Sequence, residues 1–137
     1  MANRPAGMLL ASVGLSVGDS MIEAMTSDTA LRKAIANWPE VARHVCARLR
    51  TESRHVGGDP LLDAAADRLA DQGADPGRGV LPAIIPVHYR LADTTLALFS
   101  TIAAFGSAED IALAEMKIEL LFPFDDATRR ALVALAG

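Results

Sequence analysis

The sequence predicts an α+β fold, in which short helices are laid over one face of a small antiparallel sheet. In the first half of the chain, apolar residues recur at three- and four-residue spacing, which is typical of amphipathic helices. From Leu81 onward, apolar and polar residues alternate, which indicates strands. A last helical pattern closes the chain, so helices and strands are segregated along the sequence.

Short helices are expected first. Asn3, Asp19 and Asp28 each precede a turn or two of apolar residues at helical spacing and are the expected N-caps. A longer helix is predicted over residues 37–53, with Asn37 as its cap and a proline near its first turn. Its apolar side chains fall on one face, which we expect to pack into the core.

A second helix of this group is expected after Gly57 and Gly58, which should end the long helix, with Asp59 as its cap. The residues expected on its inner side are Leu61, Leu62, Ala65, Ala66 and Leu69. Residues 71–80 are rich in glycine and are predicted to form an exposed loop.

The strands form a three-stranded meander in this prediction. Residues 82–91 and 95–105 read as a hairpin with a tight turn at residues 92–94. A two-residue loop would place on one face Ile85, Val87, Tyr89 and Leu91 with Leu96, Leu98, Ser100 and Ile102; a three-residue loop would reverse this assignment. The third strand, residues 115–124, is predicted to turn inward Met116, Ile118, Leu120 and Phe122, and outward Lys117 and Glu119. One face would then be apolar throughout, and a C-terminal helix capped by Asp125 and Asp126 follows.

Composition limits the class of protein. The 137 residues suffice for one domain, and with 51% hydrophobic but only 4% aromatic residues its core is expected to be aliphatic. The net charge of −4 argues against direct nucleic-acid binding by this chain. Cys46 is the only cysteine, which fits a reducing cytoplasm, and neither a signal peptide nor a membrane span is predicted.

Residues 32–54 are locally basic, with six Lys or Arg residues against two acidic ones, a local charge of +4 that leaves −8 for the rest. A solvated helix face is the favoured interpretation, and a docking surface is the alternative. A helix-turn-helix is also conceivable here, but Pro39 falls where its second helix would begin and Trp38 has the character of a core residue.

No catalytic set emerges from the sequence. His44 and Cys46 are two apart on a helix and point to different faces, and neither His55 nor His88 has a matched partner. The adjacent acids Glu109-Asp110 and Asp125-Asp126 are explained as a turn and a helix cap. We therefore predict a non-enzymatic protein without catalytic residues, metal site or cofactor. The apolar sheet face could close as packed core or leave a pocket for a small apolar molecule.

Several short motifs resemble one family, the MmyB-like ligand-binding domain at the C-terminus of XRE-type helix-turn-helix transcription regulators of bacteria. The similar features are Asn37-Trp38, the Leu-Phe-Ser-Thr segment 98–101, Phe105-Gly106 with Asp110, the segment 115–119 from Glu115 to Glu119, and Phe122-Pro123 with Asp125. Residues 2–10 also resemble the segment that follows the first strand of that domain.

The resemblance implies a PAS-like fold and a sensor that binds a small apolar, fatty-acyl-type ligand. Combined with the facing directions above, it makes candidate pocket residues of Met25, Trp38, Val87, Tyr89, Leu98, Ile102, Met116 and Ile118. The alternative is a structural or dimerisation domain with a fully packed core and no ligand.

The resemblance also carries an expectation about the N-terminus. Residues 1–137 are expected to form a single domain that lacks the helix-turn-helix and the opening strand of the family. A missing strand would leave a sheet edge with unpaired backbone groups. We therefore expect a homodimer, with exchange of N-terminal segments as one way to build it.

Overall fold

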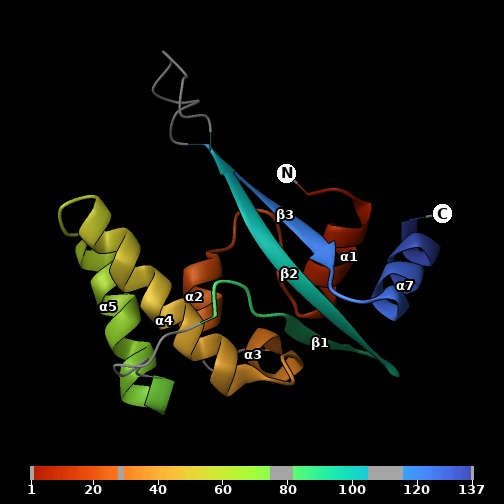
Figure 1. Ribbon diagram of the computed structural model, residues 1–137, viewed down its shortest axis with the longest axis horizontal. Coiled ribbons are helices and arrows are strands. Elements are labelled where there is room, and N and C mark those ends of the chain that lie inside the picture. The colour runs from red at the N-terminus through yellow and green to blue at the C-terminus, as the bar shows by residue number, and fades with distance from the viewer. Residues whose placement is uncertain (1, 28–29, 75–81, 105–115, 137) are drawn as a thin grey trace.

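A computed structural model describes residues 2–27, 30–74, 82–104 and 116–136 (Figure 1). Its helices are α1 (Arg4–Ser12), α2 (Met21–Thr26), α3 (Ala30–Ala34), α4 (Trp38–His55), α5 (Pro60–Leu69) and α7 (Asp126–Ala136), with a π-helical turn η1 (Ala70–Ala74). Its strands are β1 (Val87–Leu91), β2 (Thr94–Ala104) and β3 (Lys117–Pro123), which form one antiparallel sheet in the order β1-β2-β3. The predicted α+β, PAS-like fold with a three-stranded meander and a C-terminal helix is confirmed.

Some of the expected helix caps are confirmed by hydrogen bonds, and others are not. Asn3 Oδ1 accepts a hydrogen bond from the N–H of Ala6, and Asp59 Oδ1 accepts one from the N–H of Leu61. The cap of α2 is Ser20 and not Asp19, whose carboxylate accepts instead from the N–H of Ser16. Asp and Ser are both favourable N-cap residues, and here the hydroxyl of Ser20 accepts the hydrogen bond from the first turn of the helix. Asp28, another expected cap, lies outside the described residues.

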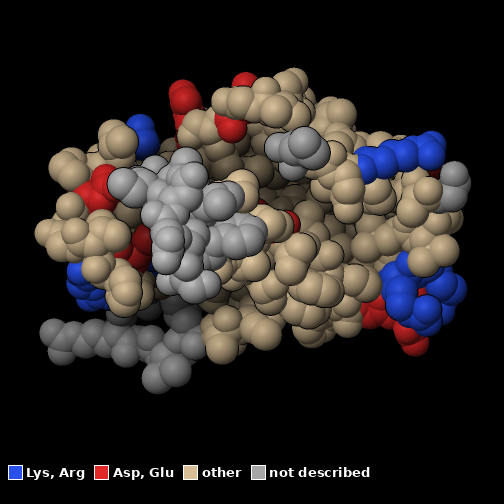
Figure 2. All heavy atoms as spheres, turned by 90° about the horizontal axis from the view of Figure 1, so that it is seen from above, with Lys and Arg blue, Asp and Glu red and all other residues tan. Residues whose placement is uncertain are grey.

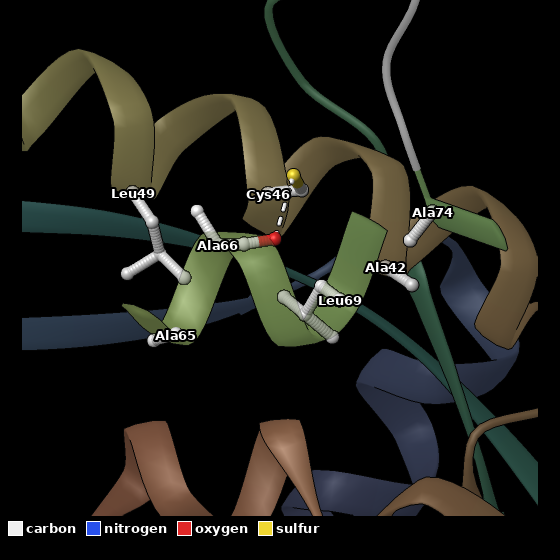
Figure 3. Close-up of a cluster of buried hydrophobic side chains, with 7 residues drawn as sticks. All are labelled: Ala42, Cys46, Leu49, Ala65, Ala66, Leu69 and Ala74. Carbon is white, nitrogen blue, oxygen red and sulfur yellow. Dashed lines mark hydrogen bonds between the residues drawn. The ribbon is translucent and has the colours of Figure 1, made fainter. Parts of the chain in front are cut away.

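Helices α4 and α5 pack on each other around small and aliphatic side chains (Figure 3). Cys46 is fully buried between them, and its Sγ lies 3.4 Å from the backbone oxygen of Ala66. The prediction that Leu61 lies on the inner side of α5 is wrong, because 79% of its surface is exposed. The first residues of the predicted loop instead belong to η1, in which Gly73 has a positive φ of 85°, and residues 75–80 lie outside the described part.

The hairpin has the predicted register. A two-residue loop, in which Ala92 has φ +49°, pairs Val87 with Leu98 and Tyr89 with Leu96. Val87, Tyr89, Leu98 and Ile102 therefore share one face, as expected. Figure 1 shows α2, α3, α4 and α5 on one side of the long β2-β3 ladder, and α1 and α7 on the other.

The facing direction of β3 differs from the prediction. Its register pairs Ile118 with Ala103 and Glu119 with Ile102. Because directly opposed residues share a face, Lys117 and Glu119 lie on the same face as Leu98 and Ile102. The β3 residues predicted to be inward therefore lie on the opposite face, namely Ile118, Leu120 and Phe122, and continued alternation would place Met116, the residue before β3, with them. Neither face of the sheet is therefore apolar from edge to edge. The register between β2 and β3 could not be derived from the sequence, because the sequence of residues 105–116 does not indicate the length of a turn.

Candidate functional site

A groove of about 370 Å³ runs along the side of α4. Among the described residues its lining is His44, Ala47, Arg48, Thr51, Glu52 and His55. These positions recur at three- and four-residue spacing, so one stripe of α4 supplies them all. The groove is open to solvent and lies on the helix side that is not packed on α5.

The sheet meets this groove at Glu52. The ammonium group of Lys117 on β3 contacts Glu52 Oε1, so the face of the sheet that carries Lys117 looks toward α4. The β3 register puts Ile102 and Glu119 on that same face. The arm formed by the second half of β2 and by β3 is thereby tied to the wall of the groove.

Two residues on or beside this face of the sheet have shifted pKa values. The hydrogen bond from Lys117 holds the pKa of Glu52 below its usual 4.5, so this carboxylate stays ionised. Burial raises the pKa of Tyr89 to about 12, and the negative charge of Glu119 adds to the effect. The phenol of Tyr89 is thus a neutral hydrogen-bonding group that lies within electrostatic reach of Glu119.

Four of the predicted site residues lie together, but in packed core. Met25, Trp38, Val87 and Tyr89 contact the buried cluster of Val13, Ala24, Leu31, Ile35 and Val41. Trp38 also packs on the α4-α5 cluster, and the guanidinium of Arg32 lies 4.7 Å from the centre of its ring. These side chains are half-buried and form the floor between β1 and the helices.

The other four predicted residues are separated from that cluster. Leu98 is almost fully buried on the face turned to the helices, and Ile102, on the same face, is 40% exposed. Met116 and Ile118 are exposed to about the same extent as Ile102, but the β3 register and its continuation place them on the opposite face. The structure therefore does not bring the eight residues into one pocket, and whether each contacts a ligand stays a prediction.

Sequence reasoning missed the polar residues of the groove. The sequence predicts that Arg48 and Glu52 belong to a solvated basic face and that Lys117 points away from the helices. The only signal for the groove is the spacing of His44, Arg48, Glu52 and His55 along one stripe of α4. That spacing does not reveal that β3 approaches the stripe, which only the tertiary structure shows.

The electrostatic character of the groove is mixed. Arg48 and the two histidines offer hydrogen-bond donors, and the negative charge of the ionised Glu52 is balanced by Lys117. In the view of Figure 2, the Lys and Arg side chains lie toward the two ends of the molecule, whereas acidic side chains also lie along its upper edge. The described residues contain no group of His, Cys, Asp and Glu side chains arranged to hold a metal ion. No helix in this part of the chain is both long and apolar enough to cross a membrane.

One family model matches almost the whole chain. The model described as "MmyB-like transcription regulator ligand binding domain" matches residues 1–135. Searches of curated proteins and of solved structures found no match.

Proposed function

The chain belongs to the family of MmyB-like transcription regulator ligand-binding domains, and we propose on this premise that it senses a small apolar molecule of the fatty-acyl class for an XRE-type regulator. The family is regulatory and is not a class of enzymes, which agrees with the lack of a catalytic set in the sequence. The proposal concerns the chemical class of the ligand and the place where it binds.

The groove along α4 is the observation that supports this proposal. Its volume, about 370 Å³, lies in the range of roughly 300–1,000 Å³ that is usual for small-molecule sites. Ala47 and the methylene stems of Arg48 and Glu52 give the groove apolar surface. The guanidinium of Arg48 would bind a carboxylate head group through charge-assisted hydrogen bonds. An apolar chain with an anionic end therefore suits this site.

The test is to purify the protein under native conditions, extract it with organic solvent and identify bound molecules by mass spectrometry. The variant Ala47→Trp places a large ring in the groove, and Ala64→Trp makes the same change on the exposed side of α5. We expect a near-stoichiometric apolar molecule in the parent and in Ala64→Trp, and its loss from a folded Ala47→Trp. No bound molecule in the parent, and no binding of added long-chain fatty acids, would contradict the proposal.

A second candidate is an interaction domain whose core is filled. It is favoured by the packing of Met25, Trp38, Val87 and Tyr89 against buried neighbours, which leaves them little surface for a ligand. In this case the parent would carry no apolar molecule, and Ala47→Trp would change neither the extract nor the response to added fatty acids.

We infer that the domain acts in the cytoplasm of a bacterial cell as a homodimer, without enzymatic activity, cofactor or direct contact with nucleic acid. Its net charge of −4 supports the last point, because binding to phosphates requires surplus Lys and Arg.

A further inference from the structure

The two outer edges of the sheet differ. At the β1 edge, the N–H of Ala36 donates to the backbone oxygen of His88, and the N–H of His88 donates to Asn37 Oδ1. Tyr89 also forms an isolated bridge with Ile35. In the described part of the chain, the outer side of β3 shows no comparable backbone hydrogen bond. Residues 35–37 therefore cover one edge of the sheet, whereas none of the described residues forms such a bond to the β3 edge, which we call the open edge.

The peptide groups on this open edge can be identified. The N–H of Phe124 donates to the backbone oxygen of Ala97, a residue of β2. Because peptide groups in an antiparallel strand alternate in direction, those of Phe122, Leu120 and Ile118 also point toward β2. The N–H and C=O groups of Lys117, Glu119 and Leu121 consequently point outward from the sheet.

The same edge exposes an unusual amount of apolar surface. Seven large apolar side chains on or beside this arm are each at least 38% exposed: Ile102, Met116, Ile118, Leu120, Leu121, Phe122 and Phe124. An edge strand with outward peptide groups and large apolar side chains is prone to pair with another strand. Natural proteins usually protect such edges, so an exposed one indicates a binding surface.

We propose that β3 pairs antiparallel with β3 of a second copy of this chain, across a two-fold axis at Ile118. The inference rests on the homodimer proposed above and names its surface, and it is independent of the ligand. The resulting dimer has one continuous six-stranded sheet, in which the β3 strand of each copy covers the open edge of the other.

The charged side chains of β3 favour this pairing register over its neighbours. With the axis at Ile118, Lys117 lies opposite Glu119 of the second copy, and the two residues exchange both of their outward hydrogen bonds. The other face brings together Ile118 with its own copy, and Met116 with Leu120 of the second copy. The ammonium group has three N–H donors, so Lys117 can hold its own Glu52 and the second Glu119 together.

Neighbouring registers are less favourable. An axis at Glu119 would set the two Glu119 carboxylates directly opposite each other, which is destabilising. An axis at Leu120 would set Lys117 opposite Pro123, which has no N–H to donate. It would also leave each Glu119 opposite an apolar Leu121.

The test uses two charge reversals and their mixture, followed by analytical ultracentrifugation of the full chain. Glu119→Lys and Lys117→Glu each create two like-charged pairs by symmetry, and each should raise the dimer dissociation constant by at least about tenfold. When the two variants are mixed, every pair is again of opposite charge, so a heterodimer should form. Asp63→Lys makes the same change of charge as Glu119→Lys, on the exposed surface of α5, and should leave the dimer unchanged.

A backbone variant provides an independent measurement. Glu119→Pro removes an outward N–H that makes no bond to β2, so the monomer should stay folded, as judged by circular dichroism, while the dimer weakens. A dimer that tolerates Glu119→Pro and both reversals would overturn the β3 interface and leave the homodimer itself standing. A protein that is monomeric throughout the micromolar range would overturn both, without bearing on the ligand.

Discussion

Thr128 is the residue at which α7 is joined to the sheet. Its Oγ1 accepts a hydrogen bond of 2.9 Å from the N–H of Ala97, and both residues are buried. Ala97 lies on β2 beyond the end of β3, where its carbonyl oxygen accepts from the N–H of Phe124. One hydroxyl group therefore satisfies a buried backbone donor that no strand reaches.

Replacing Thr128 with Val tests this role, because the two side chains have nearly the same shape. The variant leaves the N–H of Ala97 buried without its partner, so we expect a loss of about 1–3 kcal/mol in the free energy of unfolding. Thr128→Ser retains the hydroxyl and should lose less. Urea unfolding of the three proteins measures the difference. A Thr128→Val variant as stable as the parent, with a loss only in Thr128→Ser, would show that the methyl group matters and the hydrogen bond does not.

Single residues show how far sequence reasoning extends at this scale. Asp59 and Asn3 cap their helices as predicted, because capping is a local interaction that spacing alone reveals. Asn37 precedes α4 as predicted, yet its side chain makes no cap bond. Its Oδ1 accepts from the N–H of His88, 51 residues away, and its Nδ2 donates both to the backbone oxygen of Pro86, 49 residues away, and to Glu40 Oε2. No local pattern can indicate that a distant strand competes for the same amide.

At the scale of elements, the contact between α4 and β3 depends on an ion pair. Lys117 lowers the pKa of Glu52, whose usual value is 4.5. A carboxyl group with a lowered pKa in the folded state stabilises the protein above its unfolded pKa. This contribution is lost as the pH falls from about 4.5 through the lowered pKa of the folded state.

A double-mutant cycle with Glu52→Gln and Lys117→Met measures this contribution. Both side chains are partly exposed, so we expect a coupling of about 0.2–1 kcal/mol at neutral pH and low salt. The coupling should shrink in high salt and vanish in acid, once Glu52 is protonated. Urea unfolding at a concentration that keeps one oligomeric state gives the four free energies. A coupling that is the same in acid as at neutral pH would contradict the ion pair.

The elements also show why the site was only partly predictable. The register of β1 and β2 follows from a turn of two residues, so the positions of Val87, Tyr89, Leu98 and Ile102 could be read from the sequence. The register of β3 depends on a long connection, and a shift of one residue exchanges its two faces. Met116 and Ile118 were therefore assigned to the wrong face. The expected turn at Phe105-Gly106, with Glu109 and Asp110, lies outside the described residues.

At the scale of the whole molecule, the fold class was predictable because helices and strands are segregated along the chain. What the pattern does not show is that the helices enclose two buried clusters, one between α4 and α5 and one between α2, α3 and the start of α4, with β1 packed against the second. Trp38 and Val45 pack against both clusters. The start of α4 thus links the helical pair to the sheet.

This link predicts that the two clusters unfold together. Trp38→Ala removes a large side chain shared by both, and we expect it to lower the free energy of unfolding by about 3 kcal/mol. Amide hydrogen exchange should then speed up in α5 and in β1 alike, because a lost shared contact weakens both sides. Leu61→Ala, at a side chain that is 79% exposed on α5, should change the free energy of unfolding by less than about 0.5 kcal/mol. If only one of the two elements exchanged faster in Trp38→Ala, the clusters would be independent units, and ligand binding in the groove on α4 would have no route through Trp38 to the sheet.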